Sequence, residues 1–341
     1  MRVSIILLIL LSILILGYLY NNLSGISEKV PITKTSIEKF RPRPSKISRT
    51  AVSGIYPAQA RIIAIGDLHG DFDALESALG KAKLINSKGR WIGGNTHVVQ
   101  LGDILDRRPR LDKVPTPYQC CDEIKIMDTL YRLQKEASKY GGAVHCILGN
   151  HELMNVMGDL RYTTPETNRC FGGAEKRTHL FKPGGLLAKK LATHSRAIIQ
   201  IGDWVFVHGG LLPHHLQKYT ISGINKLVNN ILLGTLSLSK LDKSQQEIIL
   251  DDNGIFWTRL ISSATPNCKL ALETLRLLKI NTKNGGMVVG HTPQEEGINS
   301  CCQGKVWKVD SGMSVAFGAE NSRRIQVLEI LGNGQVVRVL K

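Results

Sequence analysis

The chain has 341 residues, of which 43% are hydrophobic and 21% are charged, an ordinary balance for a globular protein. It contains no fixed-period repeat and no collagen-like or glutamine-rich tract, and its length allows one large or two small domains. The formal net charge is +16, but only 6% of the residues are aromatic and no segment of the folded part interleaves them with basic residues. We therefore expect no nucleic-acid partner.

The first 20 residues predict a membrane anchor. Val3 to Tyr20 is uncharged and almost wholly apolar. As a helix rising about 1.5 Å per residue it would be roughly 27 Å long, close to the thickness of a bilayer core. A cleaved signal peptide is one alternative, although no A-x-A-like site follows, and a buried core helix is another. We expect residues 1–20 to form a single-pass anchor, so that the protein is a membrane protein.

Residues 21–57 have the composition of a linker. They are rich in Ser, Thr and Pro, and they include the sequence Arg41-Pro42-Arg43-Pro44, which cannot bury a core. Residues 1–57 hold eight Lys and Arg against two Asp and Glu, which gives +6 of the formal charge of +16. A basic segment beside the membrane would meet anionic lipid headgroups. The charges on the two sides of the apolar run do not decide on which side the rest of the chain lies.

Five short apolar runs read as strands, and each ends in polar residues that can bind metal or transfer protons. Since side chains at the carboxyl ends of strands collect at one edge of an open sheet, we expect these residues to converge. Oxygen and nitrogen donors without thiolate suit Mn, Fe or Zn. The runs and the residues that follow them are Ile62–Ile65 with Asp67 and His69, His97–Leu101 with Asp103, Asp106 and Arg107, Ala143–Leu148 with Asn150 and His151, Val205–Val207 with His208, and Met287–Val289 with His291.

The intervening segments predict helices and a terminal hairpin. Apolar periodicity predicts helices over Phe72–Leu84 and Asp122–Tyr140. Near the end, Lys305–Asp310 reads as a strand. Ile325–Leu331 and Gln335–Leu340 flank Gly332-Asn333-Gly334, which is a hairpin signal. This alternation favours an α/β class built in layers.

The order of these motifs resembles the phosphoprotein phosphatase family of calcineurin-like metallophosphoesterases, over about residues 60–318. It is most similar to the bacterial-type Shewanella-like branch. The stretches that point to this branch are Gly158–Tyr162, Phe256–Arg259, Val289–Gln294 and Val309–Ser314. The resemblance implies a layered α/β/β/α metallophosphoesterase sandwich over residues 58–341, here preceded by the N-terminal hydrophobic helix.

The resemblance also implies a centre of two divalent metal ions. The first would be held by Asp67, His69 and a bridging Asp103. The second would be held by Asp103 again, with Asn150, His208 and His291. Manganese is the ion that we expect, with iron or zinc as alternatives. Water shared between two such ions becomes hydroxide near neutral pH and attacks phosphorus directly. The alternative for Asn150 is that it is only a turn residue.

Two catalytic and three phosphate-binding residues are carried over in the same way. His151 would be the general acid, since an imidazolium has a suitable pKa to protonate the leaving group, and Asp106 would orient it. Arg107 and Arg259 would hold the phosphate oxygens together with Asn150. A surface role is the alternative for Arg107 and a structural role for Arg259. A Gly-rich insert carries further basic residues that are either substrate-facing or solvated, namely Arg161, Arg169, Lys176, Arg177 and His179.

The function implied is a phosphomonoesterase that hydrolyses phosphoprotein esters of Ser/Thr or Tyr. The alternative is a dinucleoside polyphosphate hydrolase, because relatives with the same core motifs cleave that anhydride. A membrane-tethered binding module without activity is a third reading, against which the complete set of ligand positions argues. The sequence does not indicate an oligomeric state.

Seven cysteines include two adjacent pairs, Cys120-Cys121 and Cys301-Cys302, and no C-x-x-C spacing occurs. A zinc ribbon and a thioredoxin motif are therefore excluded. Reduced thiols and a redox-sensitive disulfide between loops both stay open, because the compartment is undetermined.

Overall fold

The computed structural model describes residues 53–107, 121–318 and 323–341. The predicted anchor, residues 1–20, and most of the predicted linker lie outside the described residues. Within the described part, no helix is both long and apolar enough to cross a bilayer. The chain divides into two compact units, and all described residues belong to the second, Ile47–Lys341.

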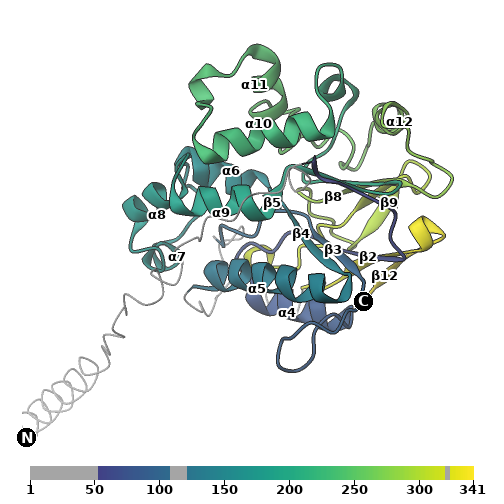
Figure 1. The fold of residues 1–341 in the computed structure, drawn as a ribbon, viewed down its shortest axis with the longest axis horizontal. Coiled ribbons are helices and arrows are strands. Elements are labelled where there is room, and N and C mark those ends of the chain that lie inside the picture. The colour runs from purple at the N-terminus through teal and green to yellow at the C-terminus, as the bar shows by residue number, and fades with distance from the viewer. Residues whose placement is uncertain (1–52, 108–120, 319–322) are drawn as a thin grey trace, which may run out of the picture. The chain divides into compact units, whose positions relative to one another are not determined.

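Two six-stranded sheets form the centre of this unit (Figure 1). In the first sheet the order is β12-β11-β2-β3-β4-β5, with β2 to β5 parallel and β11 and β12 antiparallel. In the second the order is β1-β6-β7-β8-β10-β9, with β7, β8 and β10 parallel. The strands are β1 Ile55–Tyr56, β2 Arg61–Ile65, β3 His97–Gln100, β4 Ala143–Ile147, β5 Ser195–Arg196, β6 Ile198–Ile201, β7 Trp204–Val207, β8 Gly286–Val289, β9 Asn299–Cys301, β10 Val306–Lys308, β11 Val327–Leu331 and β12 Val336–Leu340.

All five predicted strands are confirmed as β2, β3, β4, β7 and β8, each to within one residue at either end. The predicted hairpin is confirmed as well, because β11 and β12 pair antiparallel on either side of a tight turn at Gly332–Gly334. The five predicted strands are nearly continuous apolar runs because both of their faces are buried.

The two sheets pack face to face, and helices cover their outer faces. Ile62 and Ala64 of β2 point between the sheets, toward Phe206 of β7 and Val288 of β8. The alternate residues of β2 lie in the larger core with the helices. In Figure 1, α4 and α5 lie below the first sheet, and α10 and α12 lie above the second. The predicted α/β/β/α layering is thus the observed architecture.

The helices follow from their caps and apolar faces. Asp71 caps α4 by accepting the Ala74 N–H, and α4 ends at Lys81, three residues before the predicted end. The second predicted helix is α5, which continues as a 3-10 turn to Tyr140 and stops at Gly141, whose φ of 76° is left-handed. The α-helices are α4 Phe72–Lys81, α5 Asp122–Ala137, α6 Asn150–Met157, α7 Pro165–Arg169, α8 Ala174–Phe181, α9 Leu186–His194, α10 Ile221–Leu233, α11 Lys243–Ile249 and α12 Cys268–Leu277.

The folded domain begins earlier than predicted. Residues 53–57, which we placed in the linker, belong to it, because β1 pairs in parallel with β6. The Asn225 side chain also donates to the Ser53 carbonyl at 3.2 Å. A two-residue strand has no periodicity, so only its tertiary partner reveals it.

The cysteines form two disulfides, Cys121–Cys170 and Cys268–Cys302. Each adjacent pair thus contributes one cysteine to a bond with a distant partner. Cys146 and Cys301 form no disulfide, and Cys120 lies outside the described residues.

Candidate metal centre

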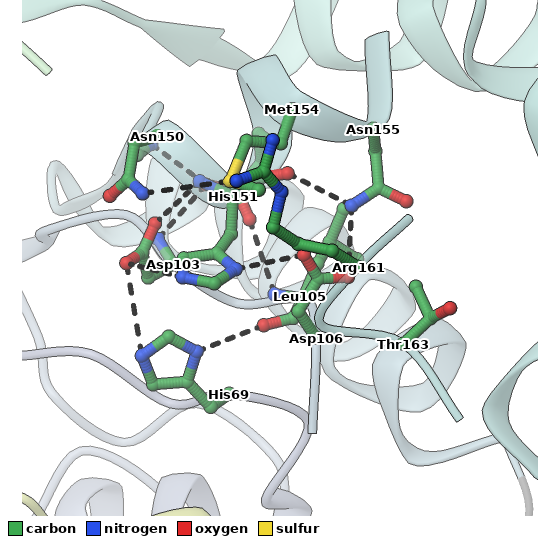
Figure 2. A network of polar contacts seen from close by, with 12 residues as sticks. His69, Asp103, Leu105, Asp106, Asn150, His151, Met154, Asn155, Arg161 and Thr163 are labelled. Carbon is green, nitrogen blue, oxygen red and sulfur yellow. Dashed lines mark hydrogen bonds and ion pairs between the residues drawn. The ribbon is translucent and has the colours of Figure 1, made fainter. Parts of the chain in front are cut away.

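The ends of the five strands meet, and the carboxylate of Asp103 lies at their meeting point. Its Oδ2 is 3.3 Å from Nε2 of His208, 3.7 Å from Nε2 of His69 and 3.9 Å from Nε2 of His151. Figure 2 shows the Asp103 carboxylate close to the rings of His69 and His151. These residues follow four different strands, and the fold brings them together as the motif pattern predicts.

Two groups of donor atoms in the described residues are tight enough to hold an ion. His69, Asp103 and His151 form one, and Asp103, His208 and His291 form the other, with all ligand atoms of a group within 4.8 Å of one another. Asp103 belongs to both, which is the position predicted for a bridging ligand. His151, predicted as an acid, belongs to the first group.

The other two predicted ligands lie beside these groups. Asn150 Oδ1 is 2.9 Å from Nε2 of His208 and therefore faces the second group. The Asp67 carboxylate accepts the backbone N–H of His291, at 3.1 and 3.3 Å. It is part of neither group, but it contacts His291, a member of the second group.

Three of the imidazoles are oriented in the same way. Nδ1 of His69 donates to the Leu105 carbonyl at 3.1 Å, and Nδ1 of His208 donates to the Leu101 carbonyl at 2.7 Å. Nε2 of His291 donates to the Trp257 carbonyl at 2.9 Å. Since one ring nitrogen of each binds a backbone carbonyl, the other nitrogen is the one that can bind a metal ion. This donor set fits divalent metal ions.

The charge balance at the centre also favours cations. Asp67, Asp103, Glu152 and Asp310 are all buried. Burial, with Asp310 and Asp103 close by, raises the pKa of Asp67 well above its usual value. Burial would likewise raise the pKa of Asp103, but the imidazoles of His208 and His151 hold it well below the usual range. Buried carboxylates are normally paired or bound to metal, so this cluster matches the oxygen and nitrogen chemistry of Mn, Fe or Zn.

Several residues at the strand ends have a strained backbone although they are not glycine. His69, Asp103, Asp106 and His291 all have positive φ, between 40° and 69°. Non-glycine residues in this region cost about 1–3 kcal/mol each and cluster at functional sites. A side chain on Gly149 would overlap Oδ1 of Asp103, so glycine is required there.

Glu152 holds the loop that carries Asp103. Its carboxylate accepts the backbone N–H groups of Asp103, Ile104, Leu105 and Gly149, at 2.7 to 3.2 Å. The motifs predict no role for Glu152. Its position three residues after Gly149, as the N3 residue of α6, is a capping signal that could have indicated one.

His151 differs from the other three imidazoles, because its partner is a carboxylate. Its Nδ1 lies 2.8 Å from Oδ2 of Asp106, which is fully buried. In Figure 2 the ring lies between the carboxylates of Asp103 and Asp106, and Asn155 points to Asp106 from above. The predicted pairing of His151 with Asp106 is thus present in the structure.

The two predicted phosphate-binding arginines are placed differently. Arg107 is buried rather than on the surface, and its Nη1 donates to Asp122 at 2.6 Å and to the Gly70 carbonyl at 2.8 Å. Arg259 is exposed, and its Nη2 donates to the His291 carbonyl at 3.2 Å, beside the second donor group.

The basic residues of the insert divide into two kinds. Arg161, Arg169, Lys176 and His179 are exposed, and the first two pair with Asp159 and Glu166. Arg177 is fully buried and reaches Asp106. Neither alternative of the sequence analysis fits Arg177. Two phenylalanines in this polar segment, Phe171 and Phe181, are the signal in the sequence that part of it is buried.

Comparison with known proteins agrees with this geometry. A family model described as calcineurin-like phosphoesterase matches residues 60–329. The chain is 32% identical over 302 residues to Shewanella-like protein phosphatase 2 of Arabidopsis thaliana, covering 74% of this chain and 71% of that protein. It is 33% identical over 262 residues to Shewanella-like protein phosphatase 1 of Plasmodium berghei, covering 75% and 67%.

Among solved structures, the fold is similar to that of a cold-active protein-tyrosine phosphatase of a psychrophilic Shewanella species. The TM-score is 0.67 at 26% identity, over 88% of this chain and 87% of the other. From the family match, these relatives and the two donor groups, we conclude that the chain belongs to the calcineurin-like phosphoesterase family, among its Shewanella-like protein phosphatases, and is a metal-dependent phosphatase.

Proposed function

We propose that this protein hydrolyses phosphomonoesters of proteins by direct attack of water on phosphorus, with His151 as the general acid. The observation that carries the proposal is the position of the His151 ring. Its Nδ1 is bound to Asp106 at 2.8 Å, while its Nε2 faces Oδ2 of Asp103 at 3.9 Å. Asp106 thus fixes the ring through Nδ1, and Nε2 points toward Asp103, which both donor groups share.

The residues that would hold two ions are those carried over from the motifs. Asp67, His69 and Asp103 would hold the first, and Asp103, Asn150, His208 and His291 the second. When bound, two divalent ions, manganese in the first place, would offset the charge of the phosphate and lower the pKa of a shared water.

In this reaction the protein itself supplies the proton for the leaving group. An imidazolium paired with a carboxylate can protonate the oxygen that leaves phosphorus. Asp106 is buried and cannot exchange this partner for water, so it holds the ring and stabilises its positive charge. Arg259, exposed beside His291, would bind the phosphate oxygens, together with Arg107 and Asn150 as carried over from the motifs.

Two aromatic rings favour a phosphotyrosine substrate. The Tyr162 ring lies 4.9 Å from that of His151, and the Phe317 ring lies 5.1 Å from that of His69. Rings at the rim of a phosphate site can stack on a phenyl ring, which serine and threonine esters lack. The similar Shewanella protein is also named a tyrosine phosphatase.

A first experiment compares turnover of phosphotyrosine peptides, phosphoserine peptides and diadenosine tetraphosphate by the metal-loaded enzyme. We expect phosphopeptides to be preferred, with phosphotyrosine first. Preferential cleavage of the dinucleotide would establish the polyphosphate hydrolase alternative instead.

A second experiment tests the acid. His151→Asn should keep both metal ions and lower the rate on esters with poor leaving groups by about 10²–10⁴-fold, because these need protonation most. Aryl phosphates with leaving groups of low pKa should lose at least about an order of magnitude less. Asp106→Asn should show the same trend more weakly. Equal losses along the series, or a missing ion, would assign His151 to metal or phosphate binding.

We also propose that residues 1–20 anchor the enzyme in a membrane. The support is the length and apolarity of Val3 to Tyr20. The full chain should sediment with membranes and resist extraction by salt and alkali, whereas a chain beginning at Ile47 should stay in the supernatant. Recovery of both in the supernatant would contradict the anchor.

A further inference from the structure

Arg177 is the most deeply buried charged residue of the insert. It lies on α8 with no exposed surface, and its guanidinium lies over the ring of Phe171, 4.5 Å from the centroid, and near Phe181. A guanidinium is permanently charged, so burying it requires partners for its charge and for its N–H groups. The groups that bind the Arg177 guanidinium therefore indicate its role.

Each nitrogen of this guanidinium has a separate partner. Nη2 donates to Oδ1 of Asp106 at 3.0 Å, and Nη1 donates to Oε2 of Glu123 at 2.7 Å. Nε donates to Oδ1 of Asn155 at 2.7 Å. The three partners come from the loop after β3, from α5 and from α6, so one side chain joins three elements around Asp106.

The same partners also bind Asp106 and His151 directly. Asn155 Nδ2 donates to Oδ1 of Asp106 and to the backbone carbonyl of His151, both at 2.9 Å. Oε1 of Glu123 accepts the Asp106 backbone N–H at 2.7 Å. Oδ1 of Asp106 is thus fixed by two donors, which directs Oδ2 at the His151 ring.

The charge of Arg177 is balanced by two buried carboxylates. Asp106 and Glu123 are both buried, and Arg177 is the cation that pairs with both in the described part of the chain. A buried carboxylate without such a partner would turn toward water or toward another donor. The orientation of the Asp106–His151 pair therefore depends on a residue that lies outside every motif.

We propose that Arg177 is a positioning residue for catalysis, which holds Asp106 in the orientation that His151 needs to deliver its proton. This rests on the proposed role of His151 as the acid. Arg177 would not contact the substrate, and it contacts none of the predicted metal ligands, so its effect should be confined to proton delivery.

The experiment measures kcat/KM of Arg177→Met along a series of aryl and alkyl phosphates of graded leaving-group pKa, beside metal content and thermal unfolding. We expect wild-type metal content and a loss of about 10–100-fold on the poorest leaving groups, falling to a few-fold on the best. Arg177→Lys, which keeps the charge but not the three directed donors, should recover only part of the loss.

Two further variants separate positioning from folding. Arg177→Met removes the cation shared by two buried carboxylates, Asp106 and Glu123. The double variant Arg177→Met/Glu123→Gln removes one of these charges as well, and it should fold while keeping the leaving-group trend. Arg61→Met is the matched control, since Arg61 also binds a buried carboxylate, Glu329 at 2.7 Å, but at the opposite end of β2. It should reduce stability without any leaving-group trend.

The outcomes separate this inference from the proposed function. A leaving-group trend in His151→Asn with none in either Arg177 variant would overturn the positioning role alone. Uniform losses in His151→Asn would overturn the acid itself, and the role of Arg177 with it. Loss of metal in the folded double variant would show that Arg177 supports the metal centre rather than the proton donor.

Discussion

The two sides of the site are built by different means. On the side of the strand ends, His69, His208 and His291 are oriented by backbone carbonyls. On the side of the helices, His151 is oriented by Asp106, which is held in turn by side chains of α5, α6 and α8. Backbone carbonyls are fixed once the strands have formed, whereas a relay of side chains depends on each member. We therefore expect changes on the first side to affect metal and activity together, and changes on the second to affect activity alone.

The largest effect is expected from Asp103→Asn, which tests the first side. Removing the charge shared by three imidazoles should lower metal content and reduce kcat/KM by about 10³-fold or more. Metal analysis and phosphatase rates on one preparation check this. The control is Asp128→Asn, since Asp128 is exposed on α5 and pairs only loosely with Lys190, at 3.7 Å. Two bound ions with a near-normal rate would remove Asp103 from the bridging position.

The two disulfides allow a matched test of the second side. Cys121 immediately precedes Asp122 and Glu123, and Cys170 lies in the insert with Arg177. Cys268–Cys302, by contrast, joins the first residue of α12 to the residue that follows β9. The residues joined are 49 and 34 positions apart, so replacing either pair by serine should lower the free energy of unfolding similarly, by about 2–4 kcal/mol. Only loss of Cys121–Cys170 should also slow poor leaving groups, by a few-fold.

Denaturant unfolding and rates of both double-serine variants would decide this. Equal kinetic effects from the two pairs would mean that general stability, rather than the position of Glu123 and Arg177, limits the reaction. The comparison between the two sides of the site would then fail.

The smallest effect concerns imidazoles that face no carboxylate. Nε2 of His145 lies 3.1 Å from Nδ1 of His97 near the Tyr56 ring, and burial together with His97 and Arg196 lowers the pKa of His145 to about 3. At the metal centre, by contrast, Asp103 overcomes burial and raises the pKa of His208. The neighbouring groups therefore lower the pKa of the imidazole at His145 and raise it at His208.

The sign of the pH dependence follows from this depressed pKa. Below about pH 6.5 the unfolded chain takes up a proton at this histidine and the folded chain does not, so stability falls as the pH is lowered from 7 to 5. His145→Gln should shrink the difference in unfolding free energy between pH 7 and pH 5 by about 1–2 kcal/mol. Unfolding curves at both pH values measure it, with exposed His179→Gln as the control. An unchanged difference would contradict the assignment.

The parts of the site that could be predicted are those with short motifs. Asp103 and His208 follow apolar strands by three residues and by one residue, so the local pattern of the sequence already marks their position. The relay could not be predicted, because Arg177 is 71 positions from Asp106 and the insert looks like a solvated basic segment. Arg107 illustrates the same limit, since its motif predicts a phosphate ligand, whereas its contacts with Asp122 and with the Gly70 carbonyl are visible only in the fold.

The class of the fold, the strands and the motif residues at their ends can be predicted from the amino-acid sequence, because apolar runs of strand length and the residues that end them are local properties of the chain. The start of the folded domain at β1, the pairing of the cysteines and the partners of Arg177 cannot be predicted in this way. These depend on which surfaces meet when two sheets and their helices pack, and burial then dictates which charges must be paired.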